Sequence, residues 1–227
     1  VVDIDGAVDM ASTLQVDGAI TSSDGATITV NDNSAALTLK STDTDASIGP
    51  ILDLARDNSS AADGDVTGTI RFIADDDANN QTTYVQLVSK IVDASDGTED
   101  GSFHIESVVG GTTQQRVDVL AGDTVFNEGS IDVDFRVESN SNSHMLFVDA
   151  GNDRVLVGKS STGLANQGVE FEGGQIKGTA TGQTVAFLNR ASDDGTILDI
   201  RKDNSVVGTI GSNSAGGVPT FDFSSNS

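Results

Sequence analysis

Residues 131–138 read Ile-Asp-Val-Asp-Phe-Arg-Val-Glu, with an apolar residue at every odd position and a charged residue at every even one. Successive side chains of a β-strand point to opposite faces, so this period of two predicts a strand with one dry and one wet face. The residues expected to face a packed sheet or an assembly interior are Ile131, Val133, Phe135 and Val137. Shorter alternations occur at Ile28 and Val30, Leu37 and Leu39, Ile70 and Phe72, Val117 and Val119, and Val155 and Val157.

The composition around this stretch also favours strands. Val and Ile number 38 against 12 Leu, a balance typical of β-structure. Seven of the 25 glycines directly follow Asp, and Asp-Gly is a strong tight-turn pair. The pattern predicts hairpins over residues 147–155 and 200–207. Residues 84–91 fit either an amphipathic helix or a strand, and their many β-branched side chains favour the strand.

The first 46 residues carry a loose internal repeat. Asp-Gly-Ala recurs at 5–7, 17–19 and 24–26, with spacings of 12 and 7 that are too irregular for a fixed-period solenoid. Short strand-turn units of this kind cannot bury a core alone, because each is a ribbon with few apolar residues and open edges. Three identical chains wrapped around an axis would join the apolar faces and pair the edges, so we expect a homotrimer.

The charge and composition exclude several classes of protein. Asp and Glu total 35 against 12 Lys and Arg, for a net charge of −23. Contacts to nucleic acid or anionic lipid need clustered Lys and Arg, so neither is an expected partner. The longest apolar runs have about four residues, so no membrane insertion is expected. Zero Cys excludes disulfides and thiol chemistry. A start at Val1 without a signal-peptide pattern leads us to expect a processed product or a fragment.

Three stretches resemble modules of phage tail fibre proteins, of the type that often carry a C-terminal endosialidase-like intramolecular chaperone. The first is FLNRASDDGTILDIRKD at 187–203, which closes on VGTIGS at 207–212. The second comprises GPILDLAR at 49–56, GDVTGTIRF at 64–72 and DGTEDG at 96–101. The third is HMLFVD at 144–149 with NDRV at 152–155.

The resemblance covers roughly residues 48–212 and implies an intertwined, β-rich homotrimer in a virion appendage. The sequence departs from the family pattern after Ser212, where no chaperone follows. Release by self-cleavage, truncation, or a lineage without a chaperone would each explain this difference.

Side chains that could support catalysis are few. His104 alternates with Phe103 and Ile105 on a predicted strand, so we expect it to point to solvent; neither it nor His144 is expected to serve a Ser-His-Asp triad. Paired carboxylates hydrolyse glycosides, but among 35 acids close pairs arise by chance, and the chain has no Trp for sugar stacking. Gly158-Lys159-Ser160 lacks the upstream glycine of a phosphate-binding loop, and we interpret it as a turn. No catalytic or cofactor-binding residue is assigned.

Calcium is the ligand that the acidic loops would suit best, because hard oxygen ligands in flexible loops are typical of calcium sites. The two candidate clusters are Asp93, Asp96, Glu99 and Asp100, and Asp75, Asp76 and Asp77 with Asn79 and Asn80. Neither has EF-hand spacing. Solvated acidic turns are the favoured interpretation, and no residue is assigned as a metal ligand.

The sequence thus predicts an all-β, elongated, intertwined homotrimeric fibre of short strands, hairpins and β-meander modules. Its expected segments are a repetitive β shaft at 1–46, a β-meander module at 47–128, and shaft and hairpin segments at 129–227. The expected function is that of a structural tail fibre protein on the virion, outside the cell, which serves as a trimeric shaft or spacer and contributes to host attachment without enzymatic activity. Expected partners are its own copies, other virion tail proteins and a host surface receptor. The alternatives are a polysaccharide-degrading tailspike and a cellular surface filament or adhesin.

Overall fold

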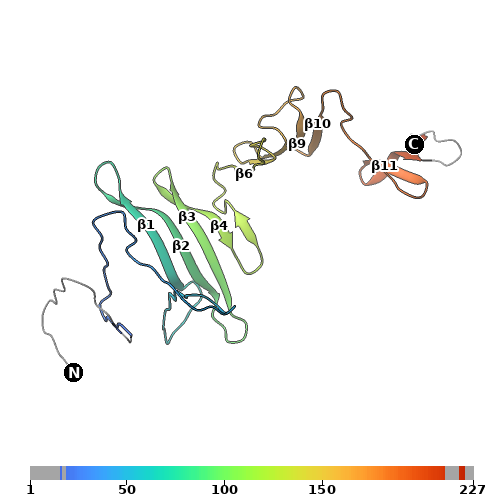
Figure 1. The fold of residues 1–227 in the computed structure, drawn as a ribbon. Coiled ribbons are helices and arrows are strands. Elements are labelled where there is room, and N and C mark those ends of the chain that lie inside the picture. The colour runs from blue at the N-terminus through green and yellow to red at the C-terminus, as the bar shows by residue number, and fades with distance from the viewer. Residues whose placement is uncertain (1–15, 17–18, 213–219, 223–227) are drawn as a thin grey trace, which may run out of the picture. The chain divides into compact units, whose positions relative to one another are not determined.

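Strands are the only regular elements in the part of the chain that the structure describes. The structure is a computed structural model that describes residue 16, residues 19–212 and the backbone of residues 220–222. This part contains thirteen strands and no helix (Figure 1), which confirms the predicted all-β class. The chain divides into two units, Val1–Leu54 and Ala55–Ser227, and every strand belongs to the second.

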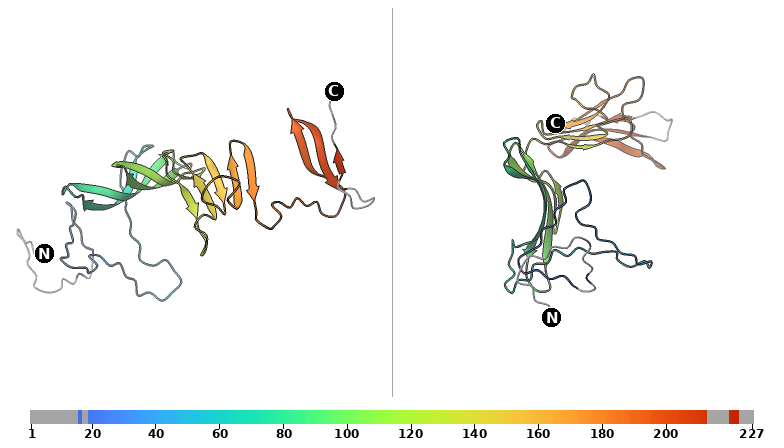
Figure 2. Two further views of the ribbon diagram at one scale, coloured as in Figure 1. Left: turned by 90° about the horizontal axis from the view of Figure 1, so that it is seen from above. Right: turned by 60° about the vertical axis from the view of Figure 1, so that its left-hand side comes forward.

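Five consecutive strands form an antiparallel meander in the order of the sequence, which we call the first sheet. They are β1 (Val66–Asp75), β2 (Gln81–Asp93), β3 (Asp100–Val109), β4 (Thr112–Val119) and β5 (Thr124–Phe126). Figure 2 shows them as one twisted layer. The predicted Asp-Gly turn before β3 is present, and Gly97 takes a φ of 87° that a glycine adopts without strain. Residues 84–91 lie within β2, so the strand interpretation is confirmed and the helix alternative is wrong.

The second sheet is also a five-stranded antiparallel meander, with strand order β10-β9-β8-β7-β6. Its strands are β6 (Phe135–Val137), β7 (Leu146–Asp149), β8 (Arg154–Val157), β9 (Gly168–Glu172) and β10 (Gln175–Thr179). The β7–β8 pair is the hairpin predicted at 147–155.

The third sheet has three antiparallel strands, β11 (Gly195–Lys202), β12 (Ser205–Ser212) and β13 (Thr220–Asp222). Its first hairpin is the one predicted at 200–207. Asp203 and Asn204 form the two-residue turn with φ values of 48° and 63°. Two positive φ values at the centre of a two-residue loop match the right-handed twist of the strands, and Asp and Asn tolerate them better than most residues.

The strand predicted over residues 131–138 is wrong in its extent, because β6 spans only Phe135–Val137. The N–H of Val133 donates to the carbonyl of Ile131 at 2.7 Å, and the side-chain amide of Asn127 donates to the same carbonyl at 2.8 Å. These local bonds bend the chain and use a backbone group that a strand would pair across the sheet. The partner strand β7 is itself only four residues long, which limits the pairing further.

The strands suggested by Ile28 and Val30 and by Leu37 and Leu39 are absent from the single chain. Residues 19–54 are drawn without any strand (Figure 1). The alternation is there, but no described segment pairs with it. The Asp-Gly-Ala copy at 5–7, and residues 17 and 18 of the next copy, lie outside the described residues.

The interior of the described chain is small and largely polar. The buried apolar side chains there are Val88, Phe147 and Leu156, whereas the buried polar ones are Ser102, His104, Glu106, Asp118, Lys159 and Glu170. Thirty-two large apolar side chains are exposed in the same residues. Burial of apolar surface is the dominant favourable term in folding, and a lone chain leaves most of that surface in water.

Candidate functional site

The second sheet has one face without a charged residue, which we call its apolar face. The register places ten residues there: Phe135, Val137, Leu146, Val148, Val155, Val157, Val169, Phe171, Ile176 and Gly178. Val137, Val148, Phe171 and Ile176 are exposed, and Ile176 keeps 75% of its surface in contact with solvent. Monomeric proteins rarely expose a contiguous apolar surface of this kind unless it binds something.

The first sheet repeats this construction. The apolar members of its corresponding face are Ile70, Phe72, Val85, Leu87, Phe103, Ile105, Val117, Val119 and Phe126. The exposed ones are Ile70, Phe72, Phe103, Val119 and Phe126. At the end of this face the ring of Phe126 packs against Phe135, with 4.9 Å between the ring centroids.

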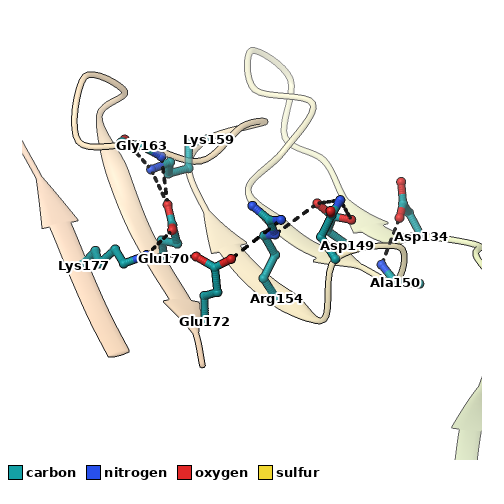
Figure 3. Close-up of polar contacts among 10 residues, drawn as sticks. Asp134, Asp149, Ala150, Arg154, Lys159, Gly163, Glu170, Glu172 and Lys177 are labelled. Carbon is teal, nitrogen blue, oxygen red and sulfur yellow. Dashed lines mark hydrogen bonds and ion pairs between the residues drawn. The ribbon is translucent and has the colours of Figure 1, made fainter. Parts of the chain in front are cut away.

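The opposite face of the second sheet carries a network of ion pairs (Figure 3). Arg154 lies between Asp149 and Glu172, at 3.5 and 3.7 Å. Lys177 bridges Glu172 and Glu170, at 2.9 and 3.0 Å. The network uses the charged residues at alternate positions of β7, β8, β9 and β10, because these positions share the face opposite to the apolar one.

Glu170 is the most deeply placed member of this network. Its side chain is 1% exposed, and it accepts from Lys159 as well as from Lys177, each at 3.0 Å. The hydrogen bond from Lys177, then that from Lys159, lowers the pKa of Glu170 to about 2. Lys159 also donates to the carbonyl of Gly163 at 3.0 Å, so the ammonium group fastens the loop after β8 to the sheet.

Gly158-Lys159-Ser160 lies in the irregular loop after β8, which bends at Gly158 and Ser160. From the sequence alone its lysine has no assigned role, and the structure gives it one. Lys159 is 6% exposed and neutralises Glu170. The sequence signal for this pair is weak, because the two residues lie on opposite sides of an irregular loop. Only the register of β8 and β9 brings them together.

The polar face of the first sheet holds a buried histidine, and the prediction that His104 points to solvent is wrong. The alternation along β3 is as expected, but His104 is 5% exposed. Its neighbours on adjacent strands bury it: Val88 on β2 and Asp118 on β4 both pair with it directly. Glu106 lies two residues along the same face and accepts from Gln86 at 2.5 Å.

Ser102, His104 and Asp118 lie close together in a way that resembles a catalytic triad. Oγ of Ser102 is 2.9 Å from Nε2 of His104, and Oδ1 of Asp118 is 2.9 Å from Nδ1. Two observations argue against nucleophilic catalysis. Ser102 is only 7% exposed, and Oδ1 of Asp118 makes no aligned hydrogen bond of the kind that orients a catalytic imidazole.

His144 lies elsewhere, in a surface hollow of about 640 Å³ lined by Asp134, Phe135, Arg136, Glu138, His144 and Phe147. Its ring meets Phe147 edge-on with 4.9 Å between centroids, and its Nδ1 contacts Oγ of Ser143 at 2.8 Å. Arg136 and Glu138 pair with each other at 2.6 Å. The third charged residue of the hollow, Asp134, accepts from the backbone N–H of Ala150 at 3.1 Å, so all three charged groups have partners within the chain.

The acidic loops do not converge. Within the described residues, no three His, Asp or Glu side chains are grouped so that they could hold a metal ion. In the 75–80 turn, Asp76 accepts from the backbone N–H of Asn80 at 2.8 Å, which lowers its pKa, and also from that of Ala78 at 2.9 Å. Asp93 likewise accepts from the N–H of Ser95 at 2.8 Å. These carboxylates serve as turn acceptors.

The described residues include no helix that is long and apolar enough to cross a membrane.

The strongest candidate site is the pair of apolar faces, each backed by a polar face with buried hydrogen bonds or ion pairs. Comparison with known proteins adds no relative: no family model, no curated protein and no solved structure matches the chain.

Proposed function

We propose that the chain is a structural segment of a homotrimeric fibre. The observation that carries this proposal is the inverted distribution of apolar residues in the described chain, with three buried and thirty-two large ones exposed. Fully burying one such side chain contributes about 1.5–3 kcal/mol. In a single chain, the exposed apolar side chains of two successive sheets do not contribute this free energy of burial. An assembly that covers the apolar faces of both sheets best explains why the chain keeps these side chains.

The charge pattern supports copies of the same chain as the covering partner. Each copy carries a net charge of −23, so copies repel each other wherever charged surfaces meet. The apolar face of the second sheet carries no charge, and apolar side chains from every strand line that of the first sheet. These faces are the surfaces through which like-charged copies can approach. A closed ring of three copies covers these faces around one axis and leaves the ion-paired faces in water.

The resemblance of residues 48–212 to tail fibre modules supports a place in a virion appendage. In this proposal the chain is a shaft or spacer of a phage tail fibre, contacts other tail proteins at its ends and contributes to host attachment. We assign it no enzymatic activity, and the low exposure of Ser102 supports that choice.

Electron microscopy of phage particles with gold-labelled antibody against the chain tests the location. We expect the label along the tail fibres. Label on filaments of the host cell surface would overturn the proposal in favour of a cellular filament or adhesin. Release of sugar from host capsule by the purified chain would overturn it in favour of a depolymerase.

A further inference from the structure

Residues 19–54 are rich in large aliphatic side chains, and these side chains are exposed in the described chain. They contain nine large aliphatic residues, Ile20, Ile28, Val30, Leu37, Leu39, Ile48, Ile51, Leu52 and Leu54, and all nine are exposed. Disordered segments typically have low hydrophobicity and high charge. Residues 26–39 differ from such segments, because they contain four large aliphatic residues and a single charged one, Asp32.

Within this segment, residues 26–30 and 35–39 form two arms with the pattern of strands. In the first arm Ile28 and Val30 alternate with threonines, and in the second Leu37 and Leu39 flank Thr38. β-branched and aliphatic residues in alternation are typical of a half-buried strand. The turn between the arms is fixed locally, because the N–H of Ser34 donates to Oδ1 of Asp32 at 2.8 Å.

Within the part of the chain that the structure describes, the backbone of neither arm has a backbone partner. Among the described residues, none from 19 to 54 makes a hydrogen bond between two backbone groups. The two arms do not pair with each other across the turn at Asp32, although the turn is in place. Each arm therefore presents a row of unpaired N–H and C=O groups, which is a ready template for pairing with another chain.

We propose that residues 26–30 and 35–39 become strands only on assembly, by pairing with the same residues of the other copies, with Ile28, Val30, Leu37 and Leu39 turned to the shared axis. This inference rests on the homotrimer proposed above. The partner that matches these arms is the same segment of another copy, because it has the same length, the same alternation and the same uncharged face. Asp32, the one like charge, lies in the turn and not in either arm.

Cysteine cross-linking tests the pairing, because the chain contains no cysteine of its own. The variant Leu37→Cys places a thiol on the face turned to the axis, and Thr38→Cys is the matched control one residue away on the opposite face. Under mild oxidation we expect Leu37→Cys to give a disulfide-linked dimer at least about fivefold faster than Thr38→Cys, since a disulfide forms only when the two Cα atoms are about 4.4–6.8 Å apart. Hydrogen exchange of residues 26–39 in the unmodified protein should be slow.

The mass of each variant, measured by light scattering on the same samples, separates the two proposals. A trimer with equal cross-linking of both variants, or with fast exchange at 26–39, would overturn the pairing and leave the homotrimer standing. A trimer with slow exchange but no cross-link would place the partner strand in the same chain and overturn it as well. A folded monomer would overturn the homotrimer itself.

Discussion

Glu170 is a buried carboxylate that two lysine side chains neutralise. Its carboxylate receives two ammonium groups, Lys159 from the loop after β8 and Lys177 from β10, and all three are joined at 3.0 Å. Removing one member of a buried pair leaves its partner charged and unpaired, which is strongly destabilising. The residue therefore fixes the loop and the strand β10 at the same time.

We expect Glu170→Gln to lower the melting temperature clearly at pH 7. The matched control is Glu138→Gln, which removes an exposed pair with Arg136 and should change the free energy of unfolding by less than about 0.5 kcal/mol. Thermal melts followed by circular dichroism measure both. Equal shifts for the two variants would show that the contacts of Glu170 add nothing to stability.

The stability that Glu170→Gln removes depends on pH in a defined way. The folded protein keeps Glu170 ionised down to a pKa of about 2, whereas the unfolded chain takes up the proton near the ordinary value of 4.5. The stabilisation is thus complete above pH 4.5 and is lost as the pH falls from 4.5 towards 2. The gap in melting temperature between the unmodified protein and Glu170→Gln should therefore narrow over that interval, and a constant gap would contradict the ion-pair account.

Ser102 provides a second test at the residue scale. Its Oγ is within hydrogen-bond distance of His104, but the side chain is 7% exposed. We expect a fluorophosphonate probe, which labels activated serines, to leave the protein unlabelled. Labelling that disappears in the variant Ser102→Ala would reveal a working nucleophile and contradict the structural role given to this cluster.

At the scale of elements, the two faces of β10 allow a matched comparison. Ile176 is 75% exposed on the apolar face, and its neighbour Gln175 is exposed on the opposite face. Both Ile176→Asp and Gln175→Asp add one negative charge to an exposed position of a single chain. Only the first puts that charge into the proposed interface, where an unpaired carboxylate costs several kcal/mol.

We therefore expect Ile176→Asp to dissociate the assembly and Gln175→Asp to leave it intact. Size-exclusion chromatography with light scattering reports the mass of each. If both variants assemble equally well, the apolar face of the second sheet is not an interface.

The elements that the sequence predicts correctly are those whose pairing partner follows directly in the chain. The hairpins at 147–155 and 200–207 and the strand through 84–91 are of this kind. A predicted strand is wrong in its extent where local contacts compete with pairing across the sheet. Residues 131–134 bend where the side-chain amide of Asn127 donates to the carbonyl of Ile131. A contact of this kind leaves no periodic pattern in the sequence.

The candidate site was predictable only in part, for the same physical reason. The alternation of apolar and polar residues identifies the two faces of a sheet, but it does not say whether the polar face is exposed to solvent. His104 lies on the polar face as expected and is nevertheless buried, because its cross-strand neighbours Val88 and Asp118 cover it. Lys159 and Glu170 are eleven residues apart in the sequence, and only the strand register makes them a pair.

At the scale of the whole molecule, charge opposes the proposed assembly. Three copies would carry about −69, and like charges at this density weaken association. Salt screens this repulsion with a Debye length of about 8 Å at physiological ionic strength. We expect the melting temperature to rise with sodium chloride concentration. A fall in melting temperature as salt increases would contradict the charge argument.

The same series with calcium at matched ionic strength tests the acidic loops. Since the carboxylates of Asp76 and Asp93 already accept backbone N–H groups in their turns, we expect sodium and calcium curves to coincide. A steeper rise in calcium would identify a metal site at the 75–77 or 93–100 loop.

The central claim is that the folded protein is an assembly of three identical chains joined through apolar sheet faces. Sedimentation equilibrium at micromolar concentration, in physiological salt, measures the mass of the folded species without reference to its shape. The account predicts a single species of about 70 kDa, three times the chain mass of 23.3 kDa, with β-structure by circular dichroism. A folded species at the mass of one chain would contradict it.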